Sequence, residues 1–175
     1  MRKETKIALD FFIDKLTNSI ENVITGDSFQ TEVSLLNSKD DLKIIKRLKG
    51  WHFDWIKELQ IPSREVYKLT IVNNNTIVQG LISLEVQENF VVMHLIENAP
   101  FNKGKNKVYL GVAGNMVAFA CRLSFQRGGE GYVLFLAKSK LLKHYEINLG
   151  AIHIGNYKMI INTKAALLLT NKYFK

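Results

Sequence analysis

The feature that most constrains the fold of this chain is a glycine-containing loop that leads directly into an apolar segment. The loop covers residues 106–115 and contains Gly111 and Gly114, and an apolar run follows it at 116–125. Glycine lets a ligand approach the backbone closely, and the N–H groups that open a helix attract anions. The pattern predicts a buried helix whose first turn binds a phosphate-bearing cofactor. Glycines that only pack against neighbours would give the same sequence, so both interpretations stay open.

Length and composition indicate one globular domain. The chain has 175 residues, of which 47% are hydrophobic and 23% are charged, which is enough for a sizeable buried core. Its one cysteine, Cys121, excludes an internal disulfide and is typical of a reducing compartment. No apolar stretch is long enough to cross a bilayer, and the charged N-terminus lacks the pattern of a signal peptide. We therefore expect a cytoplasmic protein with no membrane partner.

The chain is basic, with 24 Lys and Arg residues against 16 Asp and Glu residues and a formal net charge of +8. Such a charge favours polyanions, acidic partners or a phosphorylated cofactor. Lys103, Lys105 and Lys107 directly precede the glycine loop. No zinc-finger spacing or RNA-recognition motif accompanies the basic residues, so a nucleic-acid partner is not expected. The 4 histidines are dispersed along the chain, and no metal site is predicted.

The N-terminal part of the chain has apolar residues at helical spacing. These residues are Leu9, Phe12, Ile13, Leu16, Ile20, Val23 and Ile24. Gly26 follows the pattern and would end a helix. We expect residues 1–26 to form a helical extension that packs on a single domain of residues 27–175.

The rest of the chain predicts a mixed α+β fold. Strands are expected at 29–36, 51–55, 66–72, 76–86, 90–96, 132–137, 151–154 and 157–161, and helices at 40–48, 112–126, 140–148 and 165–173. Short turns make 66–96 an antiparallel meander. The connection from 90–96 through the helix at 112–126 to 132–137 is a crossover, so those two strands should be parallel. We expect a mostly antiparallel sheet with helices on both faces.

This order of elements resembles the GCN5-related N-acetyltransferase (GNAT) family over residues 66–161. The family's pyrophosphate loop is Gln/Arg-x-x-Gly-x-Gly/Ala, and Val108-Tyr109-Leu110-Gly111-Val112-Ala113 supplies its Gly and Ala but has Val108 at the first position. Phe119-Ala120-Cys121 and Gly131-Tyr132-Val133 are also similar to a GNAT core. His144-Tyr145-Glu146-Ile147-Asn148-Leu149-Gly150 resembles the family's Leu-Tyr-x-x-x-Gly segment.

The resemblance implies a binding site for acetyl-CoA or coenzyme A. The strand that ends at Asn98 would splay away from 132–137, and its free backbone groups near Ile96 would bind the pantetheine arm like an added strand. Main-chain amides of the glycine loop would hold the pyrophosphate, and nearby lysines would meet the adenosine phosphates. The cofactor-binding residues implied in this way are Ile96, Asn98, Lys105, Lys107, Leu110, Gly111, Val112, Ala113, Gly114, Asn115 and Ser139.

The resemblance also implies direct attack of an amine on the thioester, which requires a base and an acid. Glu97, at the end of the splayed strand, is the first candidate for the base, and Glu85 on the neighbouring strand is the second. The alternative is that Glu97 is only an exposed carboxylate at the end of a strand, without a catalytic role. Tyr145 is the candidate acid, although counting back from Gly150 puts the family's tyrosine at Glu146, a displacement that turns a helical side chain by about 100°. His94 is expected to be structural.

Two classes of function follow. The first is an N-acyltransferase that uses acetyl-CoA and transfers its acyl group directly to an amine of a small molecule or peptide. The alternative is a catalytically weak or inactive GNAT-like module that binds CoA or interacts with other proteins, because Val108 and Tyr145 depart from the family pattern. The acceptor cannot be inferred from the sequence, and a homodimer is left open.

Overall fold

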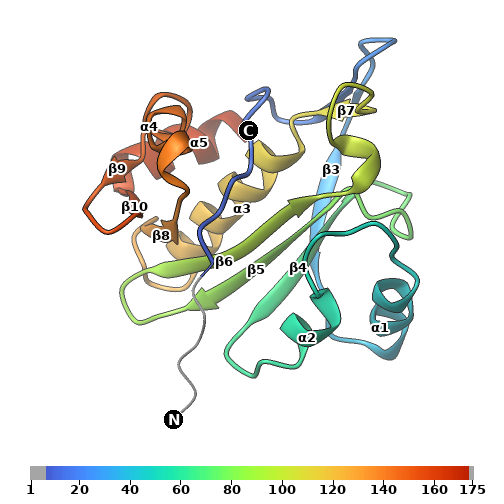
Figure 1. Ribbon diagram of the computed structural model, residues 1–175, viewed down its shortest axis with the longest axis horizontal. Helices are drawn as coiled ribbons and strands as arrows, with labels where there is room; N and C mark the ends of the chain where they lie inside the picture. Colours follow the sequence, from blue (N-terminus) through green and yellow to red (C-terminus); the bar gives the residue numbers. More distant parts are fainter. Residues whose placement is uncertain (1–6, 174–175) are drawn as a thin grey trace.

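A seven-stranded mixed sheet forms the centre of the computed structural model, which describes residues 7–173 (Figure 1). Its strand order is β3-β4-β5-β6-β8-β10-β9. The strands are β3 (Thr31–Leu35), β4 (Glu65–Ile71), β5 (Gly80–Val86), β6 (Val91–Asn98), β8 (Val133–Leu136), β9 (Ile152–His153) and β10 (Lys158–Ile161). Neighbouring strands of this sheet are antiparallel except β6 and β8, which are parallel. The predicted meander, crossover and fold class are confirmed.

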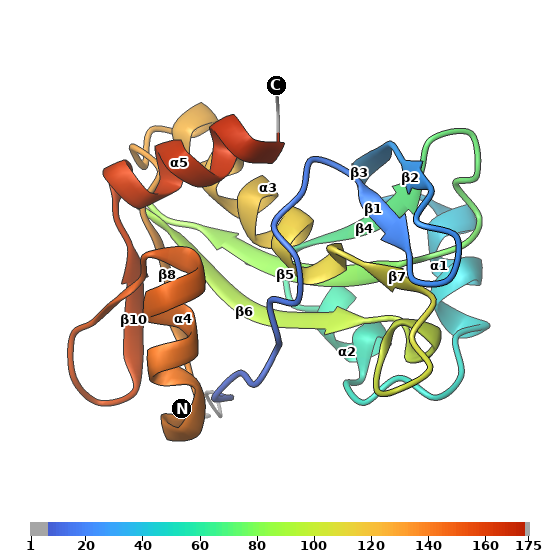
Figure 2. The same cartoon turned by 90° about the horizontal axis from the view of Figure 1, so that it is seen from above.

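Helices cover both faces of the sheet. They are α1 (Lys39–Lys46), α2 (Trp55–Leu59), α3 (Val112–Gln126), α4 (Leu142–Leu149) and α5 (Thr163–Tyr173), with the 3-10 turns η1 (Pro100–Asn102) and η2 (Ser139–Leu141). Helix α3 packs against α5, β5 and β6, whereas α1 and α2 lie together over the other face (Figures 1 and 2). Ser38 caps α1, and its hydroxyl accepts a hydrogen bond of 3.1 Å from the Asp41 amide.

Helix α3 is the most deeply buried helix of the described chain, as its apolar sequence predicts. Met116, Val117, Ala120 and Cys121 are all 0% exposed. Because both the sheet and α5 cover it, polar side chains would be costly on almost every face. The sheet and α5 therefore fix the position of its first turn.

A small second sheet joins the N-terminal part of the chain to the loop that precedes α3. Its strand order is β2-β1-β7, with β1 at Ile20–Asn22, β2 at Ser28–Phe29 and β7 at Tyr109–Leu110. Glu21 pairs with Leu110 in this sheet. The end of the glycine loop is thus held as a short strand beside the N-terminal part of the chain.

The helix predicted for residues 1–26 is wrong over residues 7–26, which contain no helix, and residues 1–6 lie outside the described part of the chain. Leu9, Phe11 and Ile13 are 1%, 9% and 4% exposed, whereas Phe12 between them is 58% exposed. This alternation is the period of an extended chain, with every second side chain directed into the core. The helical pattern placed Phe12 on the buried face and left Phe11 out, whereas the structure buries Phe11 and exposes Phe12. We call residues 9–19 the N-terminal strap.

Candidate cofactor groove

The parallel strands β6 and β8 part after only two paired positions. Val91 pairs with Val133 and Val92 pairs with Leu134, and beyond Val92 strand β6 pairs only with β5. A β-bulge lies at the point of parting, because Ser83 pairs with Leu95 while the adjacent Leu84 pairs with Met93. Because of the bulge, His94 of β6 has no residue directly opposite it on β5. Bulges of this kind bend a strand and end its pairing, so the predicted splayed pair is present.

The first turn of α3 lies at the far end of this opening. A Cβ atom added at Gly80 would lie 3.0 Å from Val112, so the start of α3 covers the end of β5 that pairs with Asn98. Gly111 caps the helix with a left-handed φ of +91°. The first intrahelical bond joins the Asn115 amide to the Gly111 carbonyl at 3.1 Å. The amides before Asn115 therefore have no acceptor within the helix, and this helix end carries partial positive charge.

The N-terminal strap lies in the opening between β6 and the unit of β8 and α4 (Figures 1 and 2). Its Leu9 amide donates to the Leu136 carbonyl at 2.8 Å, and the Lys138 amide donates to the Leu9 carbonyl at 2.9 Å. Full burial of a Leu, Ile or Phe side chain stabilises a fold by about 1.5–3 kcal/mol. Because three strap side chains are buried in this way, the strap is part of the core. The opening predicted to hold a pantetheine arm is thus filled by the chain itself.

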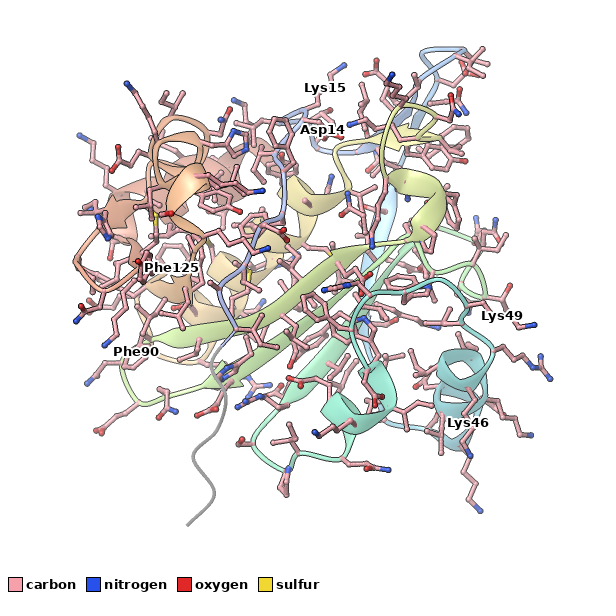
Figure 3. All side chains as sticks on the ribbon, viewed as in Figure 1. Asp14, Lys15, Lys46, Lys49, Phe90 and Phe125 are labelled. Atoms are coloured by element: carbon pink, nitrogen blue, oxygen red, sulfur yellow. The ribbon has the colours of Figure 1, made fainter. Side chains whose placement is uncertain are left out.

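Asp14 of the strap binds two of the groups that were predicted to hold cofactor phosphates. Its Oδ1 accepts a hydrogen bond of 3.0 Å from the Gly111 amide, and its Oδ2 lies 3.0 Å from Lys107 Nζ. Figure 3 labels Asp14 beside Lys15, in the middle of the strap. In this structure a carboxylate of the protein caps the Gly111 amide, so a diphosphate could bind this amide only in place of Asp14.

Other predicted residues of the first turn of α3 also contact the strap. The Asn115 side-chain amide donates to the Gly111 carbonyl at 2.7 Å and to the Ser19 carbonyl at 3.2 Å. A Cβ atom added at Gly114 would lie 2.2 Å from the Tyr173 hydroxyl and 3.3 Å from the Lys15 carbonyl. Gly114 is therefore required for close packing here, which is the alternative that the sequence left open.

Tyr145 faces the strap from α4. Its hydroxyl donates to the Phe11 carbonyl at 2.6 Å, and the two rings stack with centroids 4.5 Å apart. Burial, with a smaller contribution from the charge of Asp10, raises the pKa of Tyr145 above its ordinary value of 10.0. The neighbouring His144 accepts a hydrogen bond of 3.0 Å from the Ile13 amide at Nε2, and burial lowers its pKa. The displaced tyrosine is thus directed into the groove.

Glu97, the first candidate for the base, has a structural environment instead. Its carboxylate accepts hydrogen bonds from the amides of His52 and Phe53 and from the Trp55 indole, and it lies 2.5 Å from Lys103 Nζ. Burial alone would raise the pKa of Glu97, but these bonds outweigh it and hold the pKa below the ordinary value. The carboxylate fixes the loop before α2, where a strand was expected, and its lowered pKa makes it a weak proton acceptor.

His94, which the sequence predicts to be structural, lies in the bulge of β6. Its Nε2 lies 3.0 Å from Glu85 Oε1, and the same oxygen accepts a hydrogen bond of 2.7 Å from Arg64. Burial and the Arg64 charge lower the pKa of His94 below 6.5, so its neutral form predominates at pH 7. Alternation along β6 would place His94 on the face opposite Glu97, but the bulge at His94 interrupts that alternation.

The remaining predicted residues lie apart from the strap's polar contacts. Lys105 is exposed, and so is Ser139 at the start of η2. Ile96 is buried, and Asn98 donates to the Asn102 carbonyl at 3.5 Å. The structure therefore gathers Lys107, Gly111, Asn115 and Tyr145 around the strap, while the Glu97 side chain of β6 binds the loop before α2.

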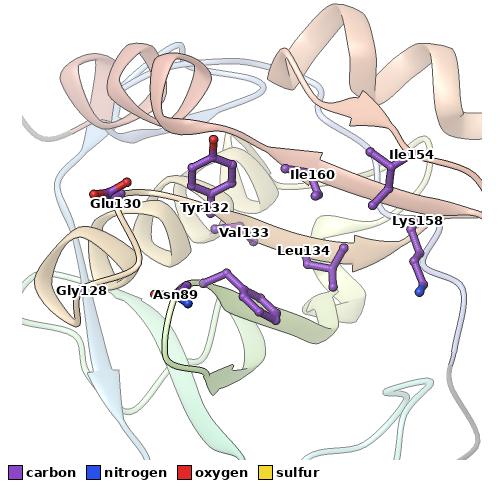
Figure 4. Close-up of a pocket in the computed structure, with 10 residues that line it drawn as sticks. Asn89, Gly128, Glu130, Tyr132, Val133, Leu134, Ile154, Lys158 and Ile160 are labelled. Carbon is purple, nitrogen blue, oxygen red and sulfur yellow. The ribbon is translucent and has the colours of Figure 1, made fainter.

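A second opening of about 480 Å³ lies on β8 and β10 (Figure 4). Apolar side chains dominate its lining, among them Phe90, Leu134 and Ile160. None of the predicted site residues lines it. Among residues 7–173, no three His, Cys, Asp or Glu side chains are grouped to hold a metal ion, and none of the helices could span a membrane.

No protein-family model and no curated protein sequence matches this chain. Among solved structures, a spermidine N-acetyltransferase from Vibrio cholerae in complex with CoA and spermine is similar at 16% identity and a TM-score of 0.53, over 79% of this chain and 98% of that one. AtaTR bound with acetyl-CoA is similar at 16% identity and a TM-score of 0.55, over 79% and 97%. The ribosomal-protein-S18-alanine N-acetyltransferase from Escherichia coli is similar at 14% identity and a TM-score of 0.50, over 76% and 95%. The chain therefore has the fold of the GNAT acetyltransferases.

Proposed function

We propose that this chain is an N-acyltransferase that takes an acyl group from acetyl-CoA or another acyl-CoA and transfers it directly to an amine. The observation that carries the proposal is the groove. Strands β6 and β8 part beside the His94 bulge, and the positively polarised end of α3 lies at the far end. A groove of this shape suits an extended, amide-rich ligand with an anionic end.

The residues present fit a cofactor that carries a diphosphate. The Gly111 amide and the Lys107 ammonium already hold an anion, the Asp14 carboxylate. With the strap displaced, the same two groups and the neighbouring helix amides would hold the phosphates. The cofactor supplies an activated acyl carbonyl when bound, and the chain supplies binding, orientation and the proton carriers.

Tyr145 and His94 are the proton carriers that the geometry favours. Tyr145 keeps its proton because its pKa is raised, so its hydroxyl would be available to donate to a sulfur leaving group. His94 is neutral at pH 7 and is oriented by Glu85, so it would accept the proton of the attacking amine. This assignment replaces Glu97. The similar structures name spermidine and the alanine of a ribosomal protein as their acceptors, which supports an amine acceptor here.

A second candidate function is a GNAT-fold module without catalysis, and the filled groove favours it. In that case the strap would be a permanent part of the core and no acyl-CoA would bind. The charge that surrounds Asp14 would then serve only to fix the strap.

Thermal unfolding with and without acetyl-CoA separates the two functions. A ligand at a hundred times its dissociation constant stabilises a folded protein by about 2.7 kcal/mol, which gives a rise in Tm of several degrees. A shift followed by amine-dependent release of free thiol would support the transferase. A shift without thiol release would support a binding module. No shift for the protein or for the Asp14→Asn variant would reject both cofactor binding and the transferase.

A further inference from the structure

We infer that the N-terminal strap is an autoinhibitory element that competes with acyl-CoA for the groove, with the Asp14 carboxylate in the place of a cofactor phosphate. The inference rests on the proposed function, because it requires that acyl-CoA binds in the groove. It adds that access to this site is controlled by the chain's own residues 9–19.

The first support is chemical mimicry at the helix end. Asp14 lies 3.0 Å from both the Gly111 amide and the Lys107 ammonium, one backbone donor and one cation. This pair of donors suits a phosphate oxygen as well as it suits a carboxylate. Because Asp14 satisfies both donors, a phosphate can reach them only after this side chain leaves.

The second support is that the strap also engages the proposed proton donor. The Tyr145 hydroxyl donates its hydrogen bond to the Phe11 carbonyl at 2.6 Å. A hydroxyl has one proton to donate, so Tyr145 cannot protonate a sulfur while Phe11 accepts its hydrogen bond. The strap therefore blocks both the positively polarised end of the groove, where phosphates would bind, and the proposed proton donor.

The third support is that the strap can leave without breaking the sheet. Within residues 7–173 it joins the large sheet only through the bridge between Leu9 and Ala137. Its outer side faces solvent, since Phe12 is 58% exposed and the side chain of Asp10 is 50% exposed. Displacement would expose the inward side chains of Leu9, Phe11 and Ile13, which an acyl chain or pantetheine in the groove would partly cover again.

A reversible cross-link tests the inference on the full chain. Asp10 Oδ2 and Lys138 Nζ lie 2.9 Å apart with about half of each side chain exposed, so D10C/K138C with a short thiol cross-linker would lock the strap. Glu65 of β4 and Arg127, the residue directly after α3, form an ion pair of 3.1 Å away from the strap and give the matched control E65C/R127C. The native Cys121 is buried, and burial raises the pKa of its thiol to about 12, so it will not take part.

We expect the locked strap to raise the dissociation constant for CoA by at least about tenfold, with recovery when the cross-link is cleaved, and no change for the locked control. Asp14→Asn should lower the dissociation constant, whereas Asp27→Asn, which removes the same charge at an exposed position outside the strap, should leave it nearly unchanged. Equal CoA binding by locked and unlocked D10C/K138C would overturn the inference and leave the transferase standing. If the unmodified protein, the unlocked D10C/K138C variant and Asp14→Asn all fail to bind CoA, both the autoinhibition and the proposed transferase would be overturned.

Discussion

The Asp14 carboxylate lies 3.0 Å from the backbone nitrogen of Gly111 and accepts its hydrogen bond at the first turn of α3. A carboxylate at this position balances the partial positive charge of the helix end. The contact joins a strap near the start of the described chain to its most deeply buried helix. The strap, the helix end and Lys107 therefore interact electrostatically through Asp14, and a change to any one of them should alter how firmly the strap is held.

Replacing Gly111 by alanine should destabilise the protein more than the same change at Gly155. Both glycines have left-handed φ angles, +91° and +94°, so about 1–2 kcal/mol of backbone strain is common to the two variants. Only at Gly111 would the new methyl meet neighbours, 3.0 Å from the Ser19 carbonyl and from the Thr17 methyl, because nothing lies within 4 Å at Gly155. Urea unfolding measures both losses. Equal losses would show that the strap is not packed against the start of α3.

Replacing Glu97 by glutamine should cost about 1.5–3 kcal/mol, because a buried charged acceptor loses its hydrogen bonds. The folded-state pKa of Glu97 is lowered below 4.5, so its contribution is present above about pH 4.5 and is lost as the pH falls through the folded-state pKa. The free energy of unfolding of Glu97→Gln should therefore vary less with pH at the acid end. Glu88→Gln, at an exposed position, is the control. If the free energy of unfolding falls equally steeply in acid for the protein and for Glu97→Gln, Glu97 does not stabilise the fold through its charge.

Acid should loosen the strap through His144. Its Nε2 must be unprotonated to accept the Ile13 amide, and burial lowers its pKa below 6.5 in the strapped state. Once released, the imidazole regains its ordinary pKa, so protonation favours release as the pH falls below about 6.5. Hydrogen exchange of the Ile13 amide, corrected for the intrinsic rate, should show falling protection over that range. His144→Gln should remove the pH dependence and the exposed His153→Gln should retain it; an unchanged profile in both would reject the mechanism.

His94 should control the acid limb of the pH–rate profile of the proposed transfer reaction. The rate should rise with pH through a pKa below 6.5, and His94→Gln should lower kcat by about 10²-fold or more. The contact with Glu85 raises the pKa of His94 against the larger effects of burial and Arg64, so Glu85→Gln should move the limb to lower pH. A pH–rate profile for CoA release provides the measurement. If the acid limb of the pH–rate profile lies at the same pH in Glu85→Gln as in the unmodified protein, His94 is not the base of the reaction.

The sheet and the buried helix could be predicted because their patterns are local. The short turns at residues 73–75 and 87–89 allow only antiparallel neighbouring strands, and the apolar run at 116–125 indicates a buried helix. The strap could not be predicted, because 9–24 satisfies a helical period almost as well as an extended one, and only burial against α4 and β8 selects the second. The environment of Glu97 could not be predicted for a related reason: its partners His52, Phe53 and Trp55 are more than 40 positions away in sequence.

Tyr145→Phe separates the proposed acid from the strap's anchor. The change removes the hydrogen bond of 2.6 Å to the Phe11 carbonyl and leaves the ring stacking in place, so the fold should survive. The strap would be held less firmly, and the dissociation constant for CoA should fall or stay the same. The transfer rate should nevertheless decrease by about 10²-fold, because the leaving sulfur loses its proton donor. Tighter or equal binding with slower transfer is the combination that a purely structural tyrosine would not produce. Equal rates in the variant and the protein, measured at saturating acyl-CoA, would show that Tyr145 only anchors the strap.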